Sequence, residues 1–256
     1  ILGNDVDELE LIEMDSDLQV SVIAGHDMLE TFLYEAERVV FDGERFYVLG
    51  TDAAGSPVRR KINITCLERD GTVVWSRRYD LPDNPSINTG DICLLSDGNV
   101  AFAAETTADF SEADGGNPMV NASLNGLVVK VDGETGEPIW SNMIAHYTTV
   151  GYNSIEEAPD GSITVGGYQQ PGVLSDEPSM MVIHLSSEGI IKDTLLIGHA
   201  GSPKAAAYPD AEGLFVDLPH GGETLFDQIR DMEWMEDGLW ICGQMGLFNA
   251  GSSLST

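Results

Sequence analysis

The residues of this 256-residue chain that could do chemistry are 43 acidic side chains, five histidines and three cysteines. His26 and His199 each follow a glycine that ends an expected strand, so two strand ends could present them on one face as ligands or acid–base groups. The simpler interpretation is that both are connector residues. Asp109, Glu112 and Asp114 lie in one polar loop whose oxygens could bind calcium, but the loop lacks the DxDxDG pattern with its distal Glu.

Catalytic and metal-binding motifs are missing from the sequence. Cys66, Cys93 and Cys242 are far apart, and each lies in an apolar strand-like run where a thiol packs as a small hydrophobe. There is no GxSxG elbow, HExxH, P-loop or GxGxxG after a strand. We therefore predict no catalytic residue, no metal site and no cofactor.

The charge balance excludes several partners. Twelve basic residues against 43 acidic ones give a formal net charge of −31, which repels nucleic-acid phosphates and anionic lipids. No apolar run approaches the roughly 18 residues that a membrane-spanning helix needs, so we expect no membrane insertion. The chain opens at Ile1 without an initiator Met or a signal-peptide core, which favours a mature, excised or truncated piece. The acidity would also fit a salt-adapted cytoplasmic protein.

An internal repeat supplies the elements that position these residues. Four segments share an apolar run, an Asp-Gly turn and a second apolar run: residues 36–50, 91–104, 154–167 and 230–243. Their turn glycines are Gly43, Gly98, Gly161 and Gly238. Asp-Gly between apolar runs predicts a β-hairpin with a type I′ turn, which needs positive φ at both central positions.

The hairpins combine into four-stranded units. Each of the first three is followed by a second hairpin, whereas residues 9–25 match a second hairpin alone and residues 229–243 a first hairpin alone. Radial stacking of such sheets covers both faces of each one. We therefore predict an all-β fold, a single β-propeller domain over residues 1–256 with four blade equivalents. Either the two ends share one closing blade, or the chain is an arc of a larger propeller.

The expected divisions follow from the hairpins. The closing blade takes 9–25 and 229–243, the complete blades are 35–80, 87–145 and 151–198, and 199–228 is left between blades. This last segment fits a degenerate hairpin or a folded insertion, and its Pro, Gly and Ala content favours the insertion.

Tryptophans recur at fixed places in the repeat. Trp75 and Trp140 follow equivalent turn glycines, where they could stack a sugar or cofactor, but large rings at a repeat position more simply fill the seam between blades. Asp193 and Val22 are assigned to the same place in the other units.

Two further tryptophans, Trp234 and Trp240, bracket the last Asp-Gly turn. We expect both to pack inside the closing blade.

The repeat carries a family resemblance. GLVVKVDGETGEPIWS at 126–141 resembles the PQQ-type propeller repeat, and DGSITVGGY and DGNVAFAAET are similar to exported bacterial "DGG" propeller repeats. The match covers most of 35–198 and returns at 230–243. It implies a propeller of the lipoprotein or surface-scaffold type, exported to a bacterial surface or periplasm. A quinoprotein enzyme would imply calcium, stacking aromatics and commonly adjacent cysteines, and this chain has no Cys-Cys pair.

The sequence thus leads to two functional hypotheses. The first is a non-catalytic binding or scaffolding propeller whose partner is a protein or a glycan, with its contact surface on 106–125 and 198–228, because rigid scaffolds present function on loops. The second is a carbohydrate-active or other hydrolytic propeller with carboxylates at the central channel. Two carboxylates about 5 to 10 Å apart, one with a raised pKa, would favour the enzyme. An axis blocked by apolar side chains would favour the scaffold.

Overall fold

The computed structural model describes residues 2–5, 8–14, 16–27, 35–54, 59–79, 87–106, 125–144, 149–170, 179–198, 214–217 and 224–247. These residues form eighteen β-strands and no α-helix. No helix in these ranges could span a membrane.

Twelve of the strands form three four-stranded antiparallel sheets, each in sequential order. We name them blades I, II and III. Blade I contains β4 (Glu35–Phe41), β5 (Arg45–Ala54), β6 (Arg59–Glu68) and β7 (Val73–Tyr79). Blade II contains β8 (Ile87–Leu94), β9 (Val100–Thr106), β10 (Asn125–Val131) and β11 (Pro138–Ile144). Blade III contains β12 (Thr149–Glu157), β13 (Ile163–Gln170), β14 (Ser179–Leu185) and β15 (Ile191–Gly198).

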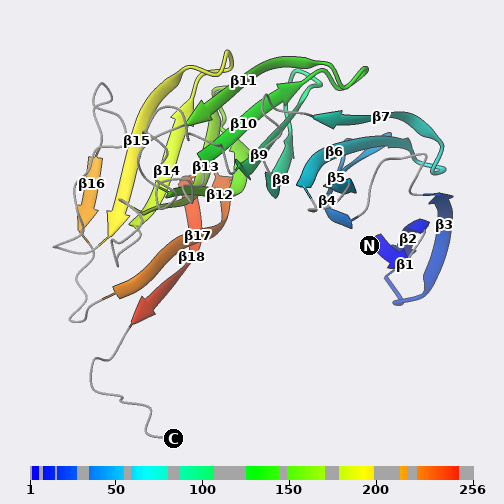
Figure 1. The fold of residues 1–256 in the computed structure, drawn as a ribbon, viewed down its shortest axis with the longest axis horizontal. Coiled ribbons are helices and arrows are strands. Elements are labelled where there is room, and N and C mark those ends of the chain that lie inside the picture. Colours follow the sequence, from blue (N-terminus) through cyan, green and yellow to red (C-terminus); the bar gives the residue numbers. More distant parts are fainter. Residues whose placement is uncertain are drawn as a thin grey trace, which may run out of the picture.

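The blades follow one another around an arc, which is the arrangement of a β-propeller. The first strand of each blade lies on the concave side of the arc and the last strand on its convex side (Figure 1). The predicted fold class, all-β with four-stranded antiparallel blades, is confirmed.

The two ends of the described chain form separate sheets. β1 (Leu2–Asp5), β2 (Glu8–Met14) and β3 (Val20–Asp27) pair with one another, and β17 (Thr224–Met235) pairs with β18 (Gly238–Leu247). These two sheets lie at opposite ends of the arc (Figure 1). In the described residues the expected half-blades 9–25 and 229–243 therefore do not pair, and of the two predicted alternatives the strands form the open arc. The reason is geometric: β17 packs on blade III and continues the arc, and three full blades do not turn far enough to bring it back to β2.

The segment between blade III and β17 contributes strands of its own. β16 (Leu214–Asp217) pairs in parallel with β15, so blade III gains a fifth strand on its outer edge. β17 begins at Thr224, inside the range expected to be an insertion.

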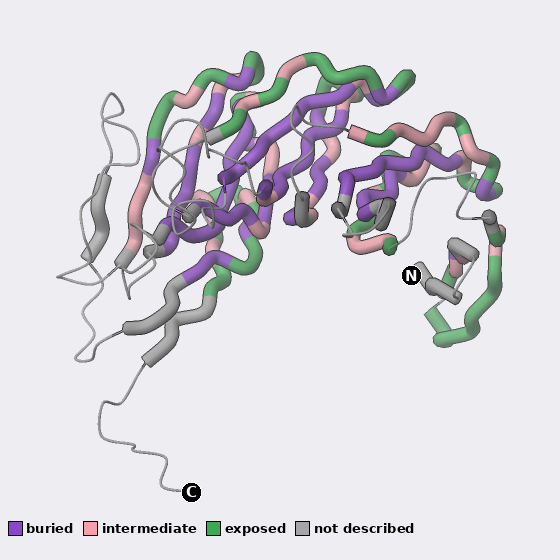
Figure 2. Tube along the Cα trace, in the orientation of Figure 1, coloured by how far each residue is buried: buried purple, intermediate pink, exposed green. Residues whose placement is uncertain are grey.

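The core lies between blades rather than within them. Along β9, Val100, Phe102 and Ala104 pack with the core of blade I, whereas Ala101 and Ala103 pack with the core of blade III. This alternation is the two-residue period of a strand. Because both faces are covered, β10 is buried at every position (Figure 2).

The Asp-Gly turns differ from the expected type I′ geometry. Gly98 N donates to Leu95 O (2.9 Å) and Leu95 N to Asn99 O (2.9 Å). This is the pattern of a type I turn followed by a bulged glycine. The four predicted turn glycines have φ of +104°, +82°, +80° and +143°. Within the described ranges, Leu18 is the only non-glycine residue at positive φ. The aspartate therefore keeps ordinary φ, and its side chain caps the turn instead: Asp97 Oδ1 accepts from Asn99 N (3.1 Å).

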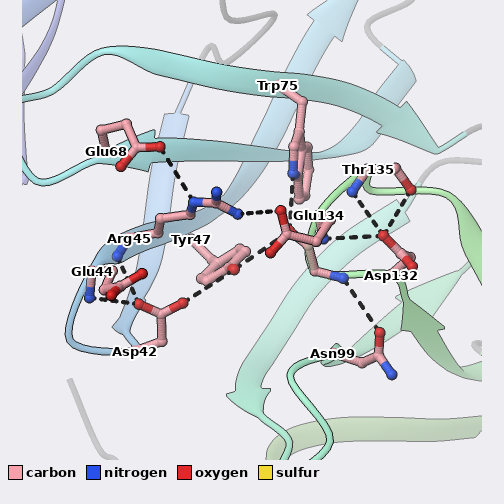
Figure 3. A network of polar contacts seen from close by, with 11 residues as sticks. Asp42, Glu44, Arg45, Tyr47, Glu68, Trp75, Asn99, Asp132, Glu134 and Thr135 are labelled. Atoms are coloured by element: carbon pink, nitrogen blue, oxygen red, sulfur yellow. Dashed lines mark hydrogen bonds and ion pairs between the residues drawn. The ribbon is translucent and has the colours of Figure 1, made fainter.

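Tryptophan side chains join each blade to the next. Trp75 Nε1 donates to Gly133 O (3.1 Å) in the last turn of blade II, and Trp140 Nε1 donates to Ser187 O (3.0 Å) in the last turn of blade III. Each ring also lies against a glycine of the turn that it contacts. In blade II this is Gly136, where an added Cβ would come within 2.8 Å of the Trp75 ring. Trp75 thus reaches across the seam between blades I and II, alongside ion pairs such as Arg45–Glu134 (2.8 Å, Figure 3).

Strand register fixes which residues share the tryptophan position. Trp75 pairs with Cys66, Trp140 with Lys130 and Asp193 with His184, each directly before a bulge. In the N-terminal sheet Val22 keeps the predicted place, four residues after Leu18, whose φ of +60° matches the turn glycines of the blades. The bulge lies two residues farther from this turn, so Val22 pairs with Ile12 after the bulge.

Replacing the turn glycines separates backbone strain from seam packing. Gly98→Ala places a Cβ at φ +82° in open space, so it should cost about 1 kcal/mol of unfolding free energy. Gly136→Ala has a similar φ of +68° but also drives a Cβ into the Trp75 ring, so we expect at least twice that loss. Urea denaturation measures both, and equal losses would contradict the account of the seam.

Candidate functional site

The concave surface of the arc is built from β4, β8, β12 and β17, which we call the inner strands. Each carries a β-bulge at the same place in the repeat. The extra residues are Glu37, Gly90, Asn153 and Arg230. A bulge bends a strand and re-aims the next side chain, and bulges are over-represented near functional sites. The concave surface is therefore the first place to look for chemistry.

In blades I to III, the residue after the bulge reaches the inner strand that follows. Asp91 Oδ2 accepts from Ile155 N (3.2 Å), and Ser154 Oγ accepts from Met232 N (3.1 Å). Ile155 and Met232 occupy equivalent positions, one residue beyond the post-bulge position of their own strands. The same latch therefore joins blade II to blade III and blade III to β17.

Blade I departs from this pattern because its post-bulge residue is Arg38, which cannot accept a hydrogen bond. Arg38 Nε lies 3.6 Å from Asp91 Oδ1 instead, an ion pair between neighbouring inner strands. Thr89 Oγ1 donates to Glu37 across the same joint. Blades I and II are thus held by charge as well as by hydrogen bonds.

The latch brings acidic side chains together. Glu156, next to Ile155, is half-buried and within electrostatic range of Asp91, Asp231 and Glu233 on the adjacent inner strands. Burial first, and then these three carboxylates, raise the pKa of Glu156 to about 7. Burial also raises the pKa of Asp91, although backbone N–H donors and Arg38 oppose the shift.

This acidic group can hold or release one proton near neutral pH. A half-buried carboxyl of raised pKa beside other carboxyl groups is an arrangement that general acids use. The same carboxylates can attract a cationic group. Within the described ranges, no three His, Cys, Asp or Glu side chains are arranged to hold a metal ion.

A serine–histidine contact occurs at a turn rather than on the concave surface. Ser162 Oγ contacts both His184 Nε2 and Asp160 Oδ1. In a hydrolytic triad the acid holds the histidine, whereas here Asp160 holds the serine, and Ser162 is only 2% exposed. Lys130 takes the place of His184 in blade II, where its Nζ lies 2.6 Å from the turn aspartate Asp97. The contact therefore positions the turn.

Most of the predicted site residues lie outside the described ranges. His199, Asp109, Glu112 and Asp114 are among them. His26 lies in β3, where its backbone pairs with Leu9. The pairing of His26 with His199 and the calcium loop therefore stay predictions.

The last hairpin is more exposed than expected. Trp234 is half-buried, and its Nε1 donates to Thr164 Oγ1 of blade III (3.2 Å). Trp240 is 63% exposed and donates to its own turn at Asp237 (3.0 Å). The expectation that Trp240 packs inside a closing blade is wrong, because the described residues place no strand beside β18. Cys242 is exposed for the same reason, whereas Cys66 and Cys93 are buried as predicted.

The post-bulge residues and Glu156 escaped the sequence reasoning. Their positions align within the repeat, and an alignment of the four inner strands would have brought them into one column. Arg38, Asp91, Ser154 and Asp231 share no chemistry, however, so the column carries no motif.

Comparisons with known proteins leave the family open. No protein-family model and no curated protein matches the chain. Among solved structures, it is similar to a Bacteroides caccae protein of unknown function (12% identity, TM-score 0.45, 96% of this chain and 66% of that one). It is also similar to the quinohemoprotein alcohol dehydrogenase of Comamonas testosteroni (13% identity, TM-score 0.48, 75% of this chain and 34% of that one). A third similar structure is quinohemoprotein alcohol dehydrogenase ADHIIG of Pseudomonas putida HK5 (13% identity, TM-score 0.46, 73% of this chain and 32% of that one). The chain thus spans less than two thirds of the first relative's length and about a third of the two enzymes' lengths.

The raised pKa of Glu156 makes stability depend on pH. A carboxyl whose pKa is higher in the folded than in the unfolded state stabilises the fold at low pH, and this stability is lost as pH rises from about 4.5 to about 7. Glu156→Gln removes the ionisable group and therefore this loss of stability at high pH. We expect equal stability of variant and wild type near pH 4.5, and an advantage for the variant of about 1 to 2 kcal/mol at pH 8 after allowance for partial exposure.

Urea denaturation across pH 4.5 to 8 measures this difference. Glu44→Gln, in the exposed Asp-Gly turn of blade I, is the matched control and should follow the wild type. An advantage for Glu156→Gln that is the same at every pH would contradict the electrostatic origin.

Proposed function

We propose that this chain belongs to a non-catalytic binding or scaffolding β-propeller. The observation that carries the proposal is the double joint between blades. Trp75 and Trp140 hold the outer strands to the next blade's turn, while Asp91 and Ser154 hold the inner strands to the next blade's backbone. Side chains committed to fixed backbone groups make a rigid curved platform.

The platform has two unlike edges. The strands of each blade are antiparallel and in sequential order, so the turns from the first to the second strand and from the third to the fourth lie at the same edge of the blade. These are the tight turns that contain Asp-Gly or Glu-Gly. The connections that leave from Thr106, Gln170 and Gly198 all start at the opposite edge. Two of these are the long segments expected to carry the contact surface, so a partner would be met at this edge.

The resemblance to PQQ-like and exported bacterial "DGG" repeats supports an exported protein of the lipoprotein or surface-scaffold type. The Asp-Gly turns and tryptophan positions that carry the resemblance serve the turns and the seams between blades. Quinone-dependent activity gains no support from them, because they are committed to structure. We propose a protein or a glycan as the partner, on a bacterial surface or in the periplasm. A net charge of −31 disfavours nucleic acid.

A hydrolytic propeller is the second candidate, and one observation favours it. Glu156 combines partial burial, a pKa of about 7 and the neighbouring carboxylate of Asp91. A glycosidase needs one carboxyl that is protonated at working pH and one that is ionised. The latch that Asp91 makes to Ile155 N argues for the binding function, because it commits the second carboxylate to structure.

Replacing residues 107–124 by a four-residue Gly-Ser linker tests the proposal. Arrays of oligosaccharides and of secreted bacterial proteins report binding by the wild type, the linker variant and Glu156→Gln. We expect at least a tenfold loss of affinity in the linker variant and none in Glu156→Gln, with both variants folded by circular dichroism. Turnover of an arrayed oligosaccharide that Glu156→Gln abolishes would replace the binding function with the hydrolytic one.

A further inference from the structure

The outer edge of β18 lacks a partner strand within the described ranges. β18 pairs only with β17, whereas the second strands of blades I to III pair on both sides. Its sequence, GLWICGQMGL, contains no charged residue, and both Trp240 and Cys242 are exposed. An uncharged, exposed edge is a template for another β-strand.

The N-terminal sheet has the features of the missing half. β2 and β3 form an antiparallel hairpin with a bulge between Leu11 and Ile12, as the third and fourth strands of blades I to III do, although this bulge lies two residues farther from the turn. Part of their apolar surface is uncovered: Val20 is 62% and Val22 57% exposed, and β3 is exposed along most of its described length (Figure 2). The position on β2 that a second strand would hold is taken only by β1, a strand of four residues.

Within one chain these two halves lie at opposite ends of the arc (Figure 1). We propose that they meet between two copies of this chain, so that β2 and β3 of each copy complete the blade begun by β17 and β18 of the other. Three full blades from each copy and two shared blades make a closed ring of eight, within the range of about four to eight blades that propellers use. Exchange of an identical element between copies is a low-cost route to a dimer.

The repeat predicts the register of the shared blade. In blades I to III, the second-strand residue opposite the post-bulge position pairs on its other side with an apolar third-strand residue, as Ala103 does with Val128. In blades I and III that third-strand residue lies seven positions before the turn glycine. Cys242 holds the second-strand place in β18, opposite Asp231, and Leu11 lies seven positions before Leu18, which has the positive φ of the turn in the N-terminal sheet. Cys242 of one copy should therefore face Leu11 of the other.

Charge decides the conditions under which the copies meet. Two chains of net charge −31 repel each other, and β2 contributes acidic residues to the contact. Salt shortens the range of this repulsion from about 30 Å at 0.01 M to about 10 Å at 0.1 M. The uncharged β18 edge loses nothing by screening, so the dimer should be favoured at high salt.

A cysteine pair tests both the partner and the register. Leu11→Cys places a thiol opposite the native Cys242, at a separation between neighbouring strands that a disulfide can span. Cys66 and Cys93 are buried, and burial raises the pKa of both, to about 12 for Cys66, so they do not compete. Mild oxidation in 0.5 M NaCl should give a disulfide-linked dimer on non-reducing electrophoresis. Light scattering of the wild type should give twice the 27.6 kDa monomer mass.

Two variants control the experiment. Leu11→Cys combined with Cys242→Ser should give no linked species, and Glu10→Cys, whose side chain points to the other face of β2, should link at least tenfold less. A monomeric mass for the wild type at 0.5 M NaCl would overturn the proposal without any substitution. A disulfide within one chain, or a ladder of open oligomers, would likewise overturn the two-copy ring.

Discussion

The blades depend on hydrogen bonds from side chains of one blade to the backbone of the next. At the convex side a tryptophan N–H meets a turn carbonyl, and at the concave side Asp91 and Ser154 accept from backbone N–H groups. Turns and bulges fix where those backbone groups lie, so the convex and concave bonds of a joint together restrict the angle between two blades. A buried backbone group left without a partner costs about 1 to 3 kcal/mol, so these bonds favour the assembled joint.

This constraint explains the unusual electrostatics of the concave surface. The carboxylate of Asp91 is needed to hold Ile155 N, so an acidic group must lie in a partly buried place between inner strands. Glu156 extends from the neighbouring position of the latched strand and meets the charges of Asp91, Asp231 and Glu233. Its raised pKa follows from blade assembly, and the same protonation that relieves the repulsion also gives the surface a group that can exchange a proton near neutral pH.

The elements that depend on local signals could be predicted from the sequence. Asp-Gly between apolar runs located the hairpins, and repetition located the blades and the shared position of Trp75 and Trp140. The turn type could not be predicted, because Asp-Gly fits both a type I′ turn and a bulged type I turn. The bulges were invisible because their extra residues, from Glu37 to Arg230, have nothing in common. The separation of the two half-blades was also beyond the sequence, since complementary patterns say which strands match and the summed angle between blades decides whether they meet.

Hydrogen exchange of a single-joint variant tests the central claim most directly. Trp75→Phe keeps an aromatic ring in the seam and removes the N–H that Gly133 O accepts. The account predicts faster exchange in β7 and in the 132–137 turn, with the joint between blades II and III at Trp140 unchanged. Equal acceleration in all three blades, or none at the 132–137 turn, would contradict the claim that each joint is held by its own side chain.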